Sequence, residues 1–328
     1  MGYLINGHWH DKWRDTEATD GSFDRPDAKI RNWITATGRP GPSGDGGFKA
    51  EAGRYHLYIA HSCPWAHRTM IFRHLKGLED MITVSVVNPI SGANGWTFEE
   101  GQGVIPDPEY GAAFLYEIYQ RSDPAYTGLV TVPTLWDKAQ KKLVSNESSE
   151  IIRMFNTAFD DIGALEGDYY PDALRPEIDE VNELVYGAIN NGVYRVGFAT
   201  SQQAYEDAYK KLFDALDQLE ERLATRSYLV GEQLTEADWR LFTTLVRFDH
   251  VYYGAFRCNK RRIVDYPNLW RFVRRLYQLP GIADTIDVWS IKAHYYASDK
   301  LLKQTRIVPL GPDIDFSDEL PDQKPEMK

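Results

Sequence analysis

The residues with the clearest potential for chemistry surround Cys63, one of only two cysteines in the chain. The preceding run, residues 55–60, is rich in aromatic and β-branched side chains with rough alternation, which is typical of a strand. Pro64 suits the first turn of a helix, because the N–H that proline lacks would be unpaired there. We therefore expect Cys63 at a helix N-terminus, where unpaired N–H groups and the helix dipole lower the pKa of a thiol. A thiolate there can act as a nucleophile, whereas a lone cysteine without this context is more often a small buried apolar residue.

A second feature is the pair Val132-Pro133, which opens a predicted strand. Proline is unusual there because it has no N–H for the hydrogen-bond ladder. A cis peptide bond would expose the backbone N–H and C=O of Val132 for pairing with an extended peptide. A trans proline at the start of a strand is the alternative.

A third feature is the run Ser145-Asn146-Glu147-Ser148, directly before the next predicted helix. Ser148 and the backbone N–H groups of a helix N-terminus can hold a carboxylate, and Glu147 can receive an ammonium group. Ordinary helix capping is the alternative. Together, the three features predict a pocket for a zwitterionic thiol peptide beside Cys63.

Composition limits the class of protein. With 328 residues, of which 43% are hydrophobic and 26% charged, the chain is long enough for two domains. Its formal charge of −11 argues against binding to nucleic acid or to an anionic membrane. No apolar run reaches the roughly 18 residues of a membrane span, and the start lacks the features of a signal peptide. Two cysteines far apart in the sequence are typical of the reducing cytoplasm, where we expect this protein.

The order of predicted elements divides the chain into an arm, two domains and a tail. Residues 1–50, rich in Gly, Asp, Arg and Pro, predict an irregular arm. Residues 51–165 predict strand–helix–strand and then strand–strand–helix, the plan of a thioredoxin-like domain, with an insertion at about 88–128. Apolar residues spaced three and four apart predict an all-helical domain over 166–312. Residues 313–328 form an acidic tail.

Six short motifs are spread along almost the whole chain. They are Cys63-Pro64-Trp65-Ala66-His67-Arg68, Asn94-Gly95-Trp96, Val130-Thr131-Val132-Pro133, Ser145-Asn146-Glu147-Ser148, Asn191-Gly192-Val193-Tyr194 and Thr235-Glu236-Ala237-Asp238. In this combination the chain resembles the glutathionyl-hydroquinone reductases, the Xi class of glutathione transferases. The resemblance implies a thioredoxin-like domain followed by an all-helical glutathione-transferase domain, and a homodimer through the helical domain.

Carried over by motif, the resemblance also assigns roles. It implies that Cys63 is the nucleophile and that Tyr194 donates a proton to the departing aromatic carbon. It implies that Tyr252 and Tyr295 direct their hydroxyls at the Cys63 sulfur. Glutathione is the implied co-substrate, and no metal is implied. The residues implied to bind glutathione are Trp96, Leu129, Val130, Thr131, Val132, Glu147 and Ser148.

Leu129 departs from the family's pattern, because the family commonly has Arg at this position before Val130. We therefore expect a cationic contact to the glycine carboxylate of glutathione to be missing. This difference concerns ligand affinity rather than chemistry.

The implied reaction begins with attack of the Cys63 thiolate on the glutathione sulfur of a glutathionyl-hydroquinone. The aromatic carbon leaves with a proton from Tyr194, and a second glutathione resolves the mixed disulfide. Such an exchange needs one reactive protein thiol and an accessible site, and Trp65 and Ala66 after Pro64 rule out a Cys-x-x-Cys motif.

Two other functions stay open at this point. One is a thiol transferase or dehydroascorbate reductase like those of the Omega class. The other is a non-catalytic glutathione-binding module, since one fold can carry unrelated functions.

Several other residues invite a functional interpretation. For His67, one turn after the nucleophile, we expect a structural role rather than that of a base. Cys258 has basic neighbours, but we expect it to be unreactive. His56 and His61 stand near the nucleophile in the sequence, yet no further ligand stands at metal spacing, so we expect no zinc site. The glycosylation sequon at Asn146 falls within the predicted ligand pocket, and we expect it to be coincidental.

Overall fold

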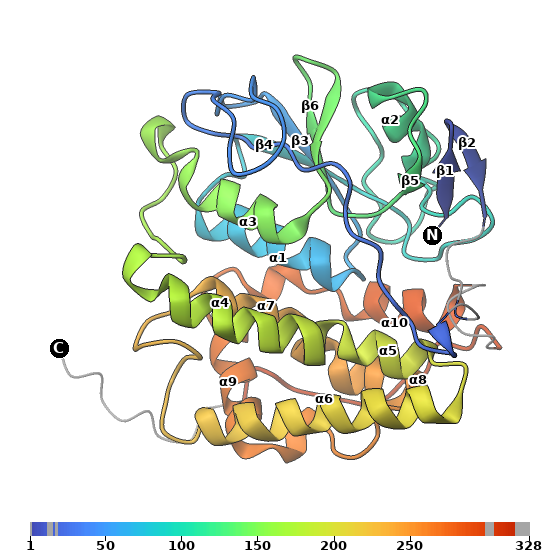
Figure 1. Cartoon of the computed structure of the whole chain (residues 1–328), viewed down its shortest axis with the longest axis vertical. Helices are drawn as coiled ribbons and strands as arrows, with labels where there is room; N and C mark the ends of the chain where they lie inside the picture. The colour runs from blue at the N-terminus through green and yellow to red at the C-terminus, as the bar shows by residue number, and fades with distance from the viewer. Residues whose placement is uncertain (1, 12–15, 17–18, 299–304, 319–328) are drawn as a thin grey trace.

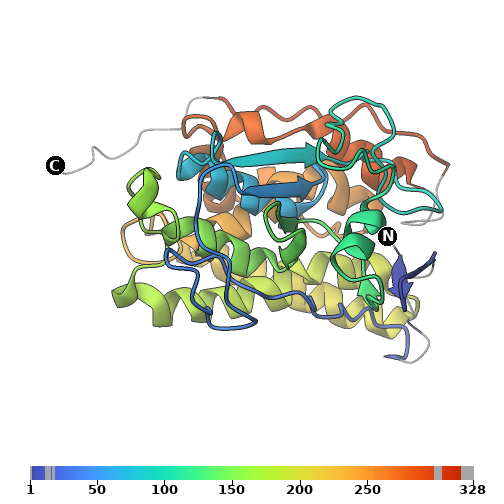
Figure 2. The same cartoon turned by 90° about the horizontal axis from the view of Figure 1, so that it is seen from above.

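The computed structural model describes residues 2–11, 16, 19–298 and 305–318. A sheet with its helices lies above a larger group of helices (Figure 1). Viewed after a 90° turn, the strands of the sheet lie over the helices of the second part (Figure 2). The fold is therefore a thioredoxin-like domain followed by an all-helical domain, as the sequence predicted.

The central sheet has four strands in the order β4-β3-β6-β7. Its strands are β3 (Tyr55–Ile59), β4 (Ile82–Val86), β6 (Thr134–Asp137) and β7 (Lys142–Ser145). β3 and β4 are parallel, whereas β6 is antiparallel to both β3 and β7. Every residue of β3 is buried, which fits a strand with a neighbour on each side and helices over one face.

Three helices belong to this first domain: α1 (Pro64–Leu75), α2 (Leu115–Ser122) and α3 (Ser148–Thr157). α1 follows β3, and α3 follows β7. α1 and α3 pack against each other and lie between the sheet and the helical domain (Figure 1), with α1 also touching α7 of that domain. α2 lies within the insertion predicted from the sequence. The N-termini of α1 and α3 carry the cysteine motif and the Glu147-Ser148 pair, respectively.

The beginning of the arm forms a hairpin, so the prediction of a wholly irregular arm is wrong here. β1 (Tyr3–Ile5) pairs with β2 (His8–His10) and with β5 (Gly128–Leu129) in a three-stranded sheet. Asn6 and Gly7 connect β1 to β2, with φ angles of 48° and 76°. Asn-Gly tolerates these positive φ values, and it is the strongest short-range indication of a hairpin. The turn and the pairing with β5 allow strands of only three residues to form.

From residue 172 onward, the regular elements of the described residues are all helical. Its elements include α4 (Arg175–Leu184), the π-helical turn η4 (Val185–Asn190), α5 (Gly192–Phe198), α6 (Gln202–Arg222), α7 (Glu236–Arg247), the π-helical turn η5 (Phe248–Tyr252), α8 (Tyr253–Ala255), α9 (Pro267–Tyr277) and α10 (Val288–Ala297). Short 3-10 turns are η2 (Asp160–Ile162), η3 (Asp172–Leu174), η6 (Ile263–Asp265) and η7 (Ala283–Thr285). Thr235 and Asp238 form a capping box, and α7 is buried along its whole length. Within the described residues, no helix has the length and apolar character needed to cross a membrane.

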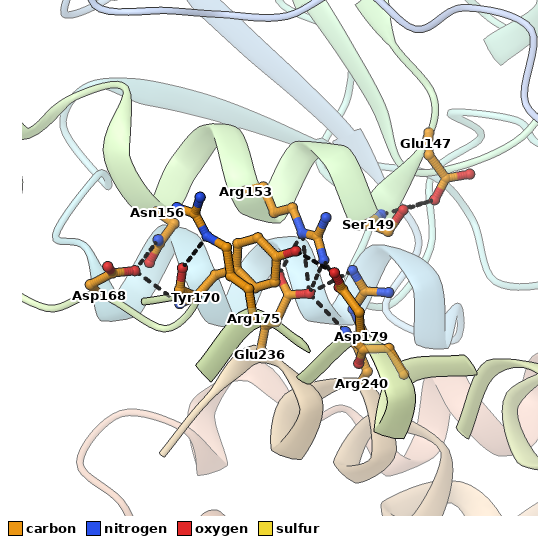
Figure 3. Close-up of polar contacts among 11 residues, drawn as sticks. Glu147, Ser149, Arg153, Asn156, Asp168, Tyr170, Arg175, Asp179, Glu236 and Arg240 are labelled. Carbon is orange, nitrogen blue, oxygen red and sulfur yellow. Dashed lines mark hydrogen bonds and ion pairs between the residues drawn. The ribbon is translucent and has the colours of Figure 1, made fainter. Parts of the chain in front are cut away.

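A polar cluster joins the two domains beneath α3 (Figure 3). The Glu236 carboxylate, fully buried at the start of α7, accepts hydrogen bonds from Arg153 of α3 at 2.8 and 3.1 Å. Arg240 and Asn182 each donate to the same carboxylate at 2.9 Å. Arg153 also pairs with Asp179 of α4 at 2.8 Å. Since a buried carboxylate needs partners of this kind, the cluster fixes the position of α3 against the helical domain.

Candidate active site

Cys63 is the N-cap residue of α1, as the Cys-Pro spacing predicted. Its backbone carbonyl accepts the first helical hydrogen bond, from the His67 N–H at 2.9 Å. Its side chain is half-buried, and the thiol donates to the backbone carbonyl of Val132 at 3.4 Å. The Val132-Pro133 bond is cis. The nucleophile candidate and the backbone predicted to pair with a peptide therefore lie in direct contact.

The pKa of Cys63 differs from the sequence-based prediction. Burial raises it, and this effect outweighs the Ala66 and Trp65 N–H groups and the charges of Arg247 and Arg25, which lower it. The expected lowering of the pKa is therefore wrong, because loss of solvation at this packed position exceeds what the helix N-terminus supplies.

Glu147 and Ser148 lie at the N-terminus of α3. Glu147 is the N-cap residue, and its Oε1 accepts hydrogen bonds from the Ser149 N–H at 2.9 Å and the Ser149 hydroxyl at 2.7 Å (Figure 3). Oε2 stays available for an ammonium group. Ser148 lines the same cavity as Glu147. The capping alternative and the binding alternative thus use different atoms of Glu147 and are compatible.

Two neighbouring cavities share Arg25, Trp65, Thr131 and Val132. The first is also lined by residues of the arm, of the segment around β5, of the α3 N-terminus and of η4: Pro26, Asp27, Ala28, Lys29, Tyr126, Leu129, Pro133, Asn146, Glu147, Ser148 and Tyr186. The second is also lined by the thiol and by aromatic residues: Cys63, Pro64, Trp96, Tyr194, Phe198, His294 and Tyr295. A polar cavity therefore opens beside an aromatic one, with Val132 between them.

Tyr194, Tyr252 and Tyr295 come from three different elements and meet at their hydroxyls. The Tyr194 and Tyr295 oxygens are 2.6 Å apart, and those of Tyr252 and Tyr295 are 3.1 Å apart. Tyr194 and Tyr252 are at 3.5 Å. Burial raises the pKa of each phenol, and the nearby Cys63 further raises that of Tyr194. All three phenols therefore stay protonated at neutral pH.

The chain matches two family models and several known proteins. The family model described as "Glutathione S-transferase, N-terminal domain" matches residues 62–158, and the corresponding C-terminal domain model matches residues 202–275. The chain is 56% identical to glutathionyl-hydroquinone reductase YqjG of Escherichia coli over 313 residues, 95% of each chain. It is 55% identical over 312 residues to glutathionyl-hydroquinone reductase PcpF of Sphingobium chlorophenolicum, covering 95% of this chain and 96% of the relative. This chain belongs to the glutathionyl-hydroquinone reductases, the Xi class of glutathione transferases.

Solved structures of Xi-class relatives have the same fold. The glutathione-bound structure of YqjG from Escherichia coli superposes with a TM-score of 0.90 at 53% identity, covering 97% of this chain and 98% of that one. The Xi-class enzyme of Natrialba magadii gives a TM-score of 0.87 at 43% identity, covering 97% and 95%. The fold class predicted from the sequence is confirmed.

Some contacts implied by the Xi-class resemblance are absent from the described residues. Among the described residues, Tyr252 and Tyr295 form no hydrogen bond with the Cys63 sulfur, and Tyr252 does not line the cavity. The two hydroxyls bond each other and Tyr194, so their implied direction toward the sulfur stays a prediction. Val130 is buried outside both cavities, and its N–H donates to the Gly2 carbonyl at 3.2 Å. Because Val130 lines neither cavity, the structure gives no support to its implied contact with glutathione.

Trp96 lines the aromatic cavity, and its implied contact with glutathione stays a prediction. Its ring stacks on His294 at 4.9 Å, in the cavity that holds Cys63. The indole N–H groups of Trp96 and Trp65 are buried with no partner among the described residues. Both donors border the cavities, so a bound ligand can satisfy them.

Two arginines of the Xi-class site escaped the sequence analysis. Arg25 of the arm donates to the Asn191 side chain at 3.0 Å, and its guanidinium lies 4.8 Å from the Trp65 ring and 5.0 Å from the Tyr194 ring. Its charge acts to lower the pKa values of Cys63 and Tyr194. Only the long-range packing of the arm brings Arg25 here, so no local pattern could have revealed it.

Arg68 is the second missed residue, although it lies inside the cysteine motif. It is buried behind the α3 N-terminus, where one nitrogen contacts the Ser148 hydroxyl oxygen at 3.5 Å and another donates to the Asn190 side chain at 3.0 Å. Because an arginine only donates, Ser148 accepts here and keeps its own proton for a ligand. The sequence signal that could have revealed Arg68 was its place in the cysteine motif, on the buried face of the helix.

Of the remaining candidates, His67 and Cys258 line neither cavity, whereas Asn146 lines the first. His67 is buried with Nδ1 accepting from Arg247 at 2.9 Å and Nε2 donating to Thr285 at 2.8 Å, and burial holds its pKa well below the ordinary value. It is a neutral structural histidine. Cys258 is fully buried, which raises its pKa well above the ordinary value. Asn146 is buried, and its side chain bonds the Ile30 N–H at 3.2 Å, which leaves no room for a glycan.

Proposed function

We propose that this chain reduces glutathionyl-hydroquinones to hydroquinones, with glutathione as the co-substrate. The observation that carries the proposal is the joint lining of one aromatic cavity by the Cys63 thiol and the Tyr194–Tyr295 phenol pair. A thiol next to proton-donating phenols suits cleavage of a bond between sulfur and an aromatic carbon. Membership of the glutathionyl-hydroquinone reductases supports the same reaction.

Glutathione is proposed to lie in the first cavity. Its cysteinyl backbone pairs with Val132, as an added strand would. Its γ-glutamyl carboxylate meets Ser148 and the N–H groups at the start of α3, where the helix dipole favours an anion. Its ammonium group meets Glu147. This arrangement places the glutathione sulfur beside Cys63, which touches Val132.

The first chemical step forms a mixed disulfide. The Cys63 thiolate attacks the glutathione sulfur, the sulfur–carbon bond breaks, and the aromatic carbon leaves with the electron pair and a proton. In the second step, another glutathione thiolate attacks the mixed disulfide and releases glutathione disulfide and Cys63. Two glutathione sulfurs are thereby oxidised to a disulfide, while the ring carbon is reduced from a C–S to a C–H bond.

The raised pKa of Cys63 slows this exchange without preventing it. Each unit of increase lowers the thiolate fraction about tenfold, but the remaining thiolate becomes about threefold more nucleophilic. The net loss is about threefold per unit. Ligand pairing with Val132 also competes for the carbonyl that accepts the Cys63 proton, so a bound peptide favours the ionised sulfur.

Tyr194 is proposed to protonate the ring carbon. It lines the cavity with Cys63, and its phenol stays protonated because burial raises its pKa. After donation, Tyr295 can stabilise the Tyr194 phenolate through the hydroxyl contact at 2.6 Å. The Tyr252 hydroxyl contacts the hydroxyls of Tyr194 and Tyr295, and its proposed role is to position them.

A direct comparison of substrates tests this function. Purified protein is expected to release hydroquinone from a glutathionyl-hydroquinone in the presence of glutathione, and to do so faster than it reduces a mixed-disulfide substrate. Faster turnover of disulfides or dehydroascorbate would favour an Omega-like thiol transferase. Glutathione binding without turnover of any of these substrates would favour a non-catalytic module.

We also propose a homodimer formed through the helical domain, a cytoplasmic location, and the division of the chain into 1–50, 51–165, 166–312 and 313–328. Of the last segment, residues 319–328 lie outside the described residues. Both cysteines are free thiols, which suits a reducing compartment. A monomer in light scattering would contradict the proposed dimer.

A further inference from the structure

One end of the glutathione cavity is formed by an apolar side chain where an anionic ligand group is expected. A tripeptide that pairs with Val132 and holds its γ-glutamyl carboxylate at Ser148 has its glycine carboxylate on the other side of Val132. Leu129, three residues before Val132, lines this cavity and is half-buried. A leucine offers neither charge nor a side-chain hydrogen bond, so this carboxylate needs a cation from elsewhere.

Lys29 of the arm lies at this end of the cavity. Its ammonium group donates to the Thr127 carbonyl at 2.8 Å, two residues before Leu129, and Lys29 and Leu129 line the same cavity. Its side-chain stem runs beside Gly128: a β-carbon placed on that glycine would lie 3.2 Å from the Lys29 Cδ. An ammonium group has three donors, so two remain for a ligand. Among the described residues, Lys29 forms no ion pair that would occupy them.

The other charged residues of the cavity leave Lys29 as the best partner. Arg25 is held by Asn191 and by the faces of Trp65 and Tyr194, toward the aromatic cavity. Asp27 and Glu147 are carboxylates and would repel an anion. Backbone hydrogen bonds fix the arm on both sides of this segment. The Gly21 carbonyl accepts from the Thr200 N–H, and the Asn32 N–H donates to the Val144 carbonyl. In Figure 1 this part of the arm, in blue, runs from the helical domain to the sheet.

We infer that Lys29 binds the glycine carboxylate of glutathione and so supplies, from the arm, the positive charge that Leu129 does not. This inference rests on the proposed function for the identity of the ligand. Lys29 is a specificity-determining residue: it selects a peptide with a free C-terminal carboxylate and takes no part in the chemistry at Cys63. The arm thereby contributes a binding residue to the glutathione site.

Isothermal titration with two ligands tests the inference on the full chain. The ligands are glutathione and its monoethyl ester, in which the glycine carboxylate is blocked. The variant Lys29→Met keeps the length of the side chain and removes its charge. It is expected to weaken glutathione binding roughly threefold to tenfold and to leave binding of the ester almost unchanged. Lys49→Met, at another exposed lysine of the arm outside the cavity, is the matched control and is expected to bind both ligands like the wild type.

Two further measurements separate a charge contact from a structural effect. Adding Leu129→Arg to Lys29→Met is expected to restore glutathione affinity, because it places a cation at the same end of the cavity. The Lys29→Met variant is also expected to raise KM for the glutathionyl substrate and to change kcat by less than about twofold, as expected when a uniform binding contact is lost.

The outcomes distinguish this inference from the proposed function. Equal affinity of wild type and Lys29→Met for glutathione, or equal losses for glutathione and its ester, would overturn the role of Lys29. Neither result would contradict the proposed reaction at Cys63, because that reaction is measured separately by hydroquinone release. Conversely, a wild-type protein that binds glutathione in a Lys29-dependent way but releases no hydroquinone would reject the proposed function alone.

Discussion

The hydroxyl oxygens of Tyr194 and Tyr295 lie 2.6 Å apart, although the two residues are 101 positions apart in the sequence. α5 supplies the first tyrosine and α10 the second, and both line the cavity that contains Cys63. A phenol that already has a hydrogen-bonding neighbour can lose its proton at lower cost, because the phenolate oxygen keeps a donor. The pair therefore combines a proton donor with the group that stabilises it afterwards.

Tyr194→Phe is expected to lower kcat/KM for glutathionyl-hydroquinones by about 100- to 10,000-fold, the usual contribution of a general acid. Steady-state release of hydroquinone measures this loss. Reduction of a mixed disulfide is expected to suffer less, because a thiolate leaving group needs no proton from a phenol. Equal losses for both substrates would show that Tyr194 acts on Cys63 rather than on the departing carbon.

The pH dependence of the reaction follows from the raised pKa of Cys63. The thiolate is the reactive form, so kcat/KM is expected to rise with pH and to reach its plateau only above the ordinary pKa of a cysteine, about 8.5. Iodoacetamide is expected to alkylate Cys63 slowly at pH 7 and faster as pH increases. A plateau already reached at pH 6 would contradict the dominance of burial at this sulfur.

Arg25 is expected to influence the same profile through its charge. Arg25→Met removes a cation that acts to lower the pKa values of Cys63 and Tyr194, so the rise in kcat/KM should move to higher pH. At pH 7 the loss is expected to be about two- to tenfold. Arg25→Lys keeps the charge and should restore most of the profile. Activity could instead fall without a shift in the pH profile, or fall equally in Arg25→Lys. Either result would indicate that Arg25 acts through its packing against Trp65 and not through its charge.

The buried cluster around Glu236 is expected to contribute to stability rather than to chemistry. Arg153→Met removes the three hydrogen bonds that Arg153 donates to this carboxylate and leaves Arg240 and Asn182 as its partners (Figure 3). We expect a loss of about 1–3 kcal/mol in the free energy of unfolding, measured by urea denaturation. Asp179→Asn removes only the exposed partner of Arg153 and should cost less than about 1 kcal/mol. Equal losses would argue against a special role for the buried carboxylate.

The local elements near the site were predictable because short-range rules decide them. Cys63 was expected at a helix N-terminus and is the N-cap residue of α1, and the cis bond at Val132-Pro133 was one of the two alternatives considered. Strand and helix periodicity gave the thioredoxin-like domain, and the six motifs gave the family. The hairpin at Asn6-Gly7 was missed although its turn residues favour one.

The features that the sequence could not reveal depend on long-range packing. Burial of Cys63 sets its pKa, and burial depends on segments far away in the chain, including Val132. Arg25 reaches the site only because the arm crosses both domains. The mutual bonding of the three tyrosine hydroxyls depends on how α5, η5 and α10 pack, which no motif encodes.

A single turnover without added glutathione tests the central claim most directly. Protein is mixed with an equal amount of glutathionyl-hydroquinone, quenched with acid, and analysed by peptide mass spectrometry. We expect one equivalent of hydroquinone and one glutathionyl group on Cys63, removed by later addition of glutathione, whereas Cys63→Ala should give neither product. Hydroquinone release with an unmodified Cys63, or undiminished turnover by Cys63→Ala, would contradict the account.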